Sequence, residues 1–126
     1  MIDRPETLVS IDPALLANCE EKRYVIVHCR NFTGGGAIRI WESTYLQDAN
    51  GHRAKLLFAI GISTYPHWCF IEKANGYSYF TLIFESLPAV RAPFRLIEDI
   101  PEPGGFYSAS TARNQSDVYH IELFCN

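Results

Sequence analysis

The chain has 126 residues, of which 48% are hydrophobic and 20% charged, and its 11 basic and 14 acidic side chains give a formal net charge of −3. This composition is that of an ordinary globular domain and excludes a fibre or a disordered chain. No lysine- or arginine-rich run is present. Counterion release from a phosphate backbone would therefore be small, and we exclude nucleic acid as a main partner.

The N-terminus carries no apolar run long enough for a signal peptide, and no segment approaches the ~20 apolar residues that cross a bilayer. We therefore expect a soluble, cytoplasmic protein that does not act at a membrane. The cysteines show no CxxC spacing, which argues against a zinc knuckle or a redox pair. We expect reduced and mostly buried thiols at all four positions, Cys19, Cys29, Cys69 and Cys125.

A helix is predicted only near the N-terminus. Over residues 13–21, Asp12 can cap one or two turns and Pro13 can occupy the first helical position. The rest of the chain shows short runs of valine, isoleucine, phenylalanine and tyrosine separated by turn residues, which is typical of an all-β sandwich or barrel. No repeat or linker divides the chain, so we expect one domain over residues 1–126.

The first half predicts three strands. Residues 24–30 are apolar at nearly every position, which is typical of a strand at the centre of a sheet. Residues 37–42 alternate between apolar and polar, and residues 54–62 have an apolar centre. Between these two segments, residues 48–51 (Asp-Ala-Asn-Gly) tolerate left-handed backbone angles, as a tight hairpin turn requires.

The second half predicts a hairpin and two further strands. Residues 67–71 run toward Asn75-Gly76, a strong hairpin signal, and residues 77–85 would form the returning strand. The remaining strands are predicted at residues 93–97 and 118–123.

Three consecutive glycines in the segment NFTGGGAIRI, residues 31–40, raise the question of a phosphate-binding loop. Such a loop needs a following lysine and a helix, because the lysine and the helix N-terminus hold the phosphates. No lysine follows, and the glycines lie between two predicted strands. The segment therefore predicts a turn, with a flexible rim that closes over a partner as the alternative.

Three segments, YVIVHCRN, IRIWESTYLQDANGHRAKLL and YFTLIFESLPAVRAPFRLIE, together span roughly residues 24 to 98 and resemble small immunoglobulin-like β-sandwich modules of unassigned function found in Bacteroidetes proteins. The matching positions are Thr44, Leu46, Asp48, Gly51, Leu56, Phe80, Leu82, Phe84, Leu87 and Pro88. The resemblance implies an immunoglobulin-like antiparallel β-sandwich. Since these positions determine the fold, it implies no chemistry, and no antibody-type disulfide between Cys29 and Cys69 is predicted.

No catalytic constellation is apparent. His28 and Cys29 are neighbours on a predicted strand, so their side chains point to opposite faces and cannot act as a nucleophile and its base. We expect the four histidines, His28, His52, His67 and His120, to lie apart from one another. The acidic residues Glu98, Asp99 and Glu102 are expected to be solvated, with nothing to raise their pKa.

No metal or cofactor site is predicted either. Asp48 and His52 flank the predicted turn and offer at most two ligands to a metal ion, which makes a poor site. The aspartate is better explained by hydrogen bonds to the backbone of its own turn. We therefore expect a protein that is not an enzyme.

The aromatic side chains are the remaining candidates for a binding site. If Ile38 and Ile40 face the core, alternation turns Trp41 toward solvent or a partner. Exposed tryptophan and tyrosine are frequent hot spots of protein contacts and also stack on sugar rings. We expect a non-catalytic protein–protein interaction module that binds another protein or itself, with a small carbohydrate-binding module as the alternative. The candidate binding residues are Trp41, Tyr45, Trp68 and Tyr79. The alternative is that the aromatic rings have a structural role and cover a face or an edge of the sandwich.

Overall fold

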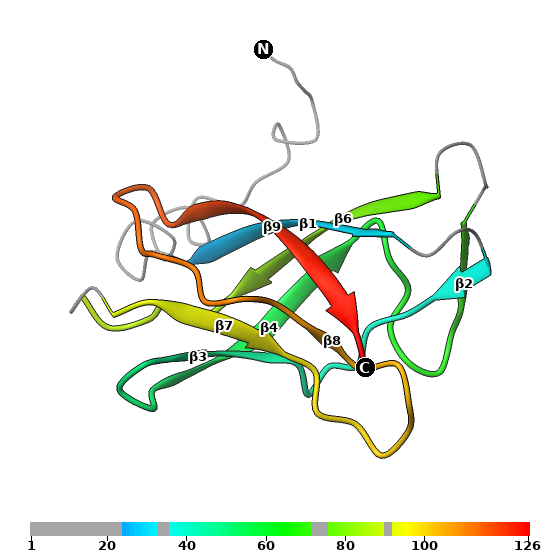
Figure 1. Cartoon of the computed structure of the whole chain (residues 1–126), viewed down its shortest axis with the longest axis horizontal. Helices are drawn as coiled ribbons and strands as arrows, with labels where there is room; N and C mark the ends of the chain where they lie inside the picture. Colours follow the sequence, from blue (N-terminus) through cyan, green and yellow to red (C-terminus); the bar gives the residue numbers. More distant parts are fainter. Residues whose placement is uncertain (1–23, 33–35, 72–75, 90–91) are drawn as a thin grey trace, which may run out of the picture.

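The structure, a computed structural model, describes residues 24–32, 36–71, 76–89 and 92–126 (Figure 1). These residues form nine strands and no helix, which confirms the all-β class. They therefore contain no helix that could cross a membrane. The helix predicted over residues 13–21 lies outside the described residues. The strands are β1 Val25–Phe32, β2 Gly36–Ile38, β3 Tyr45–Asp48, β4 Arg53–Ile60, β5 Cys69–Ile71, β6 Tyr77–Phe84, β7 Phe94–Ile97, β8 Phe106–Tyr107 and β9 Val118–Cys125.

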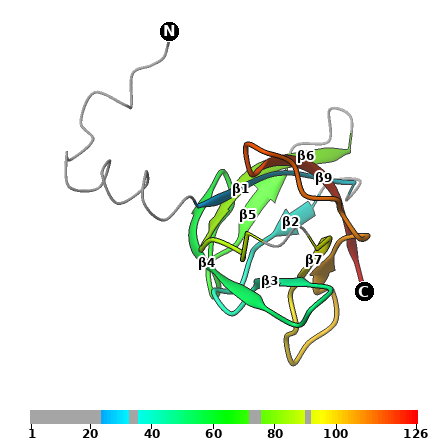
Figure 2. The ribbon, with the colours of Figure 1, turned by 90° about the vertical axis from the view of Figure 1, so that its left-hand side faces the viewer.

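Seven strands close into one barrel in the order β1-β6-β4-β3-β7-β8-β9, and β9 returns to β1. The β1–β9 pair is parallel, whereas the other neighbours in the barrel are antiparallel. Strands β2 and β5 form a separate pair at one end of the barrel (Figures 1 and 2). The sequence pattern fitted a sandwich or a barrel, and the resemblance implied a sandwich of two sheets. These hydrogen bonds instead join the seven strands into one closed ring, because the first described strand pairs with the last.

The barrel core follows from alternation along strands such as β1 and β6. In β1, Val25, Val27 and Cys29 are buried while the residues between them are more exposed, and β6 alternates in the same way. Ile38 and Ile40 are also buried, which is the condition under which Trp41 was expected to face solvent or a partner. Fully burying one such side chain contributes about 1.5–3 kcal/mol. The largest fully buried side chains are Phe84, Phe94, Ile40, Leu46, Leu82, Leu96 and Leu123.

Strand pairing differs from the prediction in the middle of the chain. The hairpin expected around Asn75-Gly76 is wrong, because β5 pairs with β2 while β6 pairs with β1 and β4. Strands β3 and β8 are additional to the expected set. The turn at residues 48–51 is confirmed: Asp48 Oδ1 accepts hydrogen bonds from the backbone N–H groups of Asn50 and His52, both at 2.9 Å.

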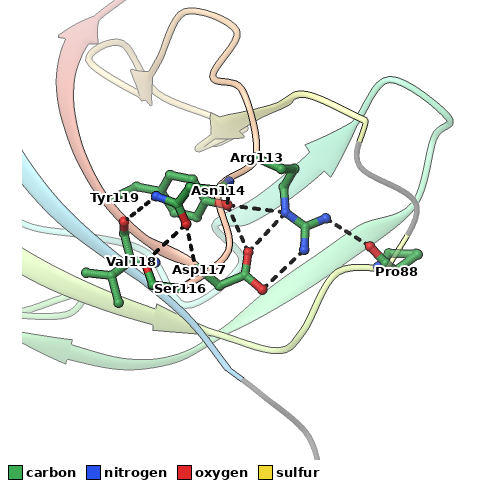
Figure 3. Close-up of polar contacts among 7 residues, drawn as sticks. All are labelled: Pro88, Arg113, Asn114, Ser116, Asp117, Val118 and Tyr119. Carbon is green, nitrogen blue, oxygen red and sulfur yellow. Dashed lines mark hydrogen bonds and ion pairs between the residues drawn. The ribbon is translucent and has the colours of Figure 1, made fainter.

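A buried polar network fixes the start of β9 (Figure 3). Arg113 donates to both carboxylate oxygens of Asp117, at 3.0 and 3.2 Å, and to the carbonyl of Pro88 at 2.9 Å. The Tyr119 hydroxyl donates to Asp117 Oδ1 at 2.8 Å and accepts from the backbone N–H of Asn114 at 3.0 Å. Since the carbonyl of Asp117 also accepts from Ile26 N at 2.9 Å, the network places β9 beside β1.

Replacing Tyr119 with phenylalanine is expected to lower the free energy of unfolding by about 1–3 kcal/mol, because it removes the hydrogen bonds that the buried hydroxyl makes with the Asn114 N–H and with Asp117 Oδ1. The measurement is urea denaturation followed by circular dichroism. Tyr107→Phe, which removes a hydroxyl from an exposed ring of β8, is the matched control and should change the free energy by less than about 0.5 kcal/mol. Equal effects of the two substitutions would contradict a stabilising role for the network.

Candidate functional site

The outward side chains of four neighbouring strands form a continuous surface, which we name the β1 face. It combines the outward residues of β1 with those that the strand register sets beside them on β9, β6 and β4. In one row, for example, His120 of β9, His28 of β1, Thr81 of β6 and Ile60 of β4 follow one another. The members are Ile26, His28, Arg30, Phe32, Phe58, Ile60, Tyr77, Tyr79, Thr81, Ile83, Val118, His120 and Glu122.

The β1 face exposes large apolar side chains around an open groove of about 690 Å³. Ile60 and Tyr79 line this groove and are 56% and 61% exposed, and Phe58 and Phe32 lie on the same face with 54% and 60% exposure. The backbone of these strands is already paired inside the barrel. Any partner would therefore be bound through side chains rather than by addition of a strand.

Two polar pairs cross the middle of the β1 face. The rings of His28 and His120 stack with centroids 4.9 Å apart, and His28 Nδ1 lies 2.8 Å from Thr81 Oγ1. In the next row, Arg30 donates to Glu122 at 2.7 Å. The expectation that each histidine lies apart is wrong for this pair, because the parallel register of β1 and β9 places the two rings side by side.

A second candidate site is a cavity of about 230 Å³ at the end of the barrel near β2. It is lined by the segment from Ala37 to Trp41, by Trp68, and by the connection between β7 and β8. We name it the end cavity; its lining residues are Ala37, Ile38, Arg39, Trp41, Trp68, Glu98, Ile100, Glu102, Pro103, Gly104, Phe106 and Cys125.

Arg39 organises one wall of the end cavity. Its guanidinium carbon lies 3.8 Å from the ring centroid of Trp68 and 4.6 Å from that of Tyr65, and its Nη2 pairs with Glu102 at 3.0 Å. Tyr65 in turn stacks on Trp41 with centroids 3.9 Å apart. Cation–π contacts of this kind each stabilise by roughly 0.5–2 kcal/mol, so the wall is held in one arrangement.

Glu98 joins the two sides of the end cavity. Its carboxylate is buried and accepts hydrogen bonds from the backbone N–H of Trp41 at 2.7 Å and from that of Phe106 at 3.0 Å. Burial raises the pKa of this carboxyl, although the two N–H groups act in the opposite direction. The expectation of a solvated acidic cluster is therefore wrong for Glu98, and Glu102 is paired with Arg39. Gly105 permits this closure, since a Cβ there would collide with the carbonyl oxygen of Glu98.

The four predicted binding residues do not form one site. Trp41 and Trp68 both line the end cavity, and both lie in the stack around Arg39 and Tyr65. Tyr79 lies on the β1 face. Tyr45 lies on β3, where its ring packs against Arg53 with the guanidinium carbon 4.3 Å from the ring centroid. The sequence predicted neither the contact of Arg39 with Trp68 nor the burial of Glu98. Only the position of Arg39, two residues from Trp41, could have signalled the first of these.

The remaining sequence candidates offer no reactive group. Burial raises the pKa of the Cys29 thiol to about 12, so it is not ionised at neutral pH. Cys69 and Cys125 are free and less buried than expected. Among the described residues, no three His, Cys, Asp or Glu side chains are grouped to hold a metal ion. Gly36 opens β2 with φ of 102°, and the rest of the glycine triplet lies outside the described residues.

Comparison of the chain with protein-family models, curated proteins and solved structures finds no match. The function is therefore inferred from the β1 face and the end cavity.

The histidine pair predicts a pH dependence of stability. Burial, and to a smaller extent the neighbouring His120, lower the pKa of His28 below the ordinary value of 6.5. The unfolded chain then binds this proton more readily than the folded chain. The free energy of unfolding therefore falls as the pH is lowered from about 6.5, and it stops falling below the lowered pKa of His28. His28→Gln should flatten this decrease, measured by urea denaturation between pH 7.5 and pH 5.

The matched control is His67→Gln, which replaces an exposed histidine away from the pair. It should retain the parent's pH dependence. If His28→Gln also retains the parent's pH dependence, the lowered pKa of His28 is not its cause.

Proposed function

We propose that this protein is a non-catalytic interaction module that associates with a second copy of itself through the β1 face. The observation that carries the proposal is that the β1 face exposes four large apolar side chains. Ile60 and Tyr79 line its groove, and Phe58 and Phe32 lie in the rows on either side of it. Large apolar side chains exposed on one face are typical of interaction sites, because water leaves apolar surface favourably on binding.

The charges of the β1 face favour a second copy as the partner. Arg30 and Glu122 lie side by side in the row next to the histidines. In a two-fold dimer the same surface of both copies forms the interface. If Arg30 of one copy contacts Glu122 of the other, then Glu122 of the first copy contacts Arg30 of the second. Rotation about an axis between Arg30 and Glu122 would set each opposite the oppositely charged residue of the other copy. The face is therefore complementary to itself.

The groups available on the β1 face support a non-catalytic role. The buried Cys29 is held as a thiol, and His28, which lies 2.8 Å from the Thr81 hydroxyl, stacks on His120 rather than bonding to a carboxylate that would activate it as a base. Nucleophilic catalysis needs a nucleophile beside such a base.

Substitution of Ile60 with aspartate is expected to weaken self-association about tenfold or more, because it places a charge in the apolar part of the interface. The measurement is sedimentation velocity over a concentration series of the full chain. Phe70→Asp, which changes an 82% exposed ring on β5, is the control and should associate like the parent. A parent chain that remains monomeric at the highest concentration would overturn the proposal.

A charge exchange tests whether the copies meet through Arg30 and Glu122. The variants Arg30→Glu and Glu122→Arg should each dimerise less than the parent, since each places like charges opposite one another. A mixture of the two should form dimers again, because one copy then carries two negative and the other two positive charges at the same positions. A mixture that behaves like the separate variants would contradict this interface.

The narrower relation to immunoglobulin-like modules is also a proposal. It is supported by the hydrogen bond between Tyr119, near the start of the last strand, and the backbone of Asn114 upstream. A tyrosine that bonds back to the chain before it is a feature of immunoglobulin-like domains, where it is called the tyrosine corner.

A further inference from the structure

We propose that the end cavity binds a single neutral sugar ring. This site is separate from the β1 face and does not depend on self-association. The cavity is smaller than the roughly 300–1,000 Å³ of pockets for drug-sized ligands, and its volume of about 230 Å³ suits one small ring.

Two N–H groups of residues that line the cavity lack an acceptor. Trp41 Nε1 and Arg39 Nε are buried and have no hydrogen-bond partner among the described residues. An unsatisfied buried donor costs about 1–3 kcal/mol. Both atoms are covered by neighbouring groups, so a ligand in the cavity would reach them only after the Trp41 or Arg39 side chain turns its N–H toward it; oxygen acceptors on the ligand would then remove that cost. The orphaned donors therefore select for a ligand rich in acceptor oxygens.

The charges around the cavity select against an anion. Arg39 is neutralised by Glu102 at 3.0 Å, and the buried carboxyl of Glu98 adds a further acidic group. An anionic oxygen would therefore meet no net positive charge. A neutral hydroxyl suits both kinds of group, since it accepts from an N–H and donates to the Glu102 carboxylate.

The aromatic surface suits the carbon face of a sugar. Trp68 is half exposed, and Arg39 lies against its ring with the guanidinium carbon 3.8 Å from the centroid, so the indole is held in place. Sugar rings have an apolar C–H face that packs on such indoles.

Intrinsic fluorescence tests the proposal directly, because the two tryptophans of the chain are Trp41 and Trp68 and both line the end cavity. The full chain is titrated with the methyl glycosides of glucose, galactose, mannose and N-acetylglucosamine, with glucuronate as the anionic probe and adenosine as the nucleobase probe. We expect a saturable change in emission with at least one neutral glycoside and a weaker response to glucuronate. Saturation-transfer NMR on the parent chain confirms that the same glycoside is bound.

The Trp41→Phe variant keeps a ring against Tyr65, removes the indole N–H and leaves Trp68 as the reporter. It should bind the glycoside at least about fivefold more weakly, and Glu102→Gln should also weaken binding if the first variant fails to fold. Ile60→Asp, on the β1 face, is the control and should bind like the parent, which separates this proposal from self-association. Oligosaccharides that carry the sugar at the end or in the interior distinguish a glycan terminus from a free monosaccharide.

The proposal is overturned if no neutral glycoside gives a saturable change in either measurement. It is equally overturned if glucuronate or adenosine binds more tightly than every neutral glycoside, or if Trp41→Phe and Glu102→Gln both bind like the parent.

Discussion

The parallel pairing of β1 with β9 closes the barrel and positions most of what surrounds it. These are the first and last described strands, and bonds such as that between Asn31 and the carbonyl of Leu123 join residues 92 apart in the chain. The entropic cost of closing a loop grows only slowly with its length, so local hydrogen bonds can offset the cost of such a distant contact. The bidentate Arg113–Asp117 pair and the Tyr119 hydroxyl secure it by fixing the backbone just before β9.

Closure also decides what kind of contacts the barrel can make. A strand at the edge of an open sheet can pair with a strand of another chain, whereas a strand in a closed barrel has a neighbour on each side. Recognition on the β1 face therefore depends on side chains alone. The same closure brings His120 beside His28 and Glu122 beside Arg30, so the polar rows of this face exist only in the folded barrel.

Local patterns predicted the elements better than their partners. The alternating or apolar runs of β1, β6 and β9 identified these strands, because alternation depends only on which face is buried. The Asn75-Gly76 signal misassigned β5 to β6, since a turn preference is local while the actual partner of β5 is β2. The same limit applied to the sites. Trp41 and Trp68 were identified as candidates, but the buried carboxylate of Glu98 is satisfied partly by the backbone N–H of Trp41, which lies 57 residues away in the chain.

The two candidate sites differ in how firmly the fold determines them. The β1 face consists of strand residues, whose direction is fixed by alternation with a buried core, so its rows follow from the barrel itself. The end cavity is built mainly from connecting segments that Glu98 holds together, and connecting segments vary in sequence more freely than strands. Its ligand preference therefore depends on a few side chains, chiefly Arg39, Trp41 and Glu102. Changes at these positions would alter what the cavity binds while leaving the closure of the barrel intact, because none of them belongs to a barrel strand.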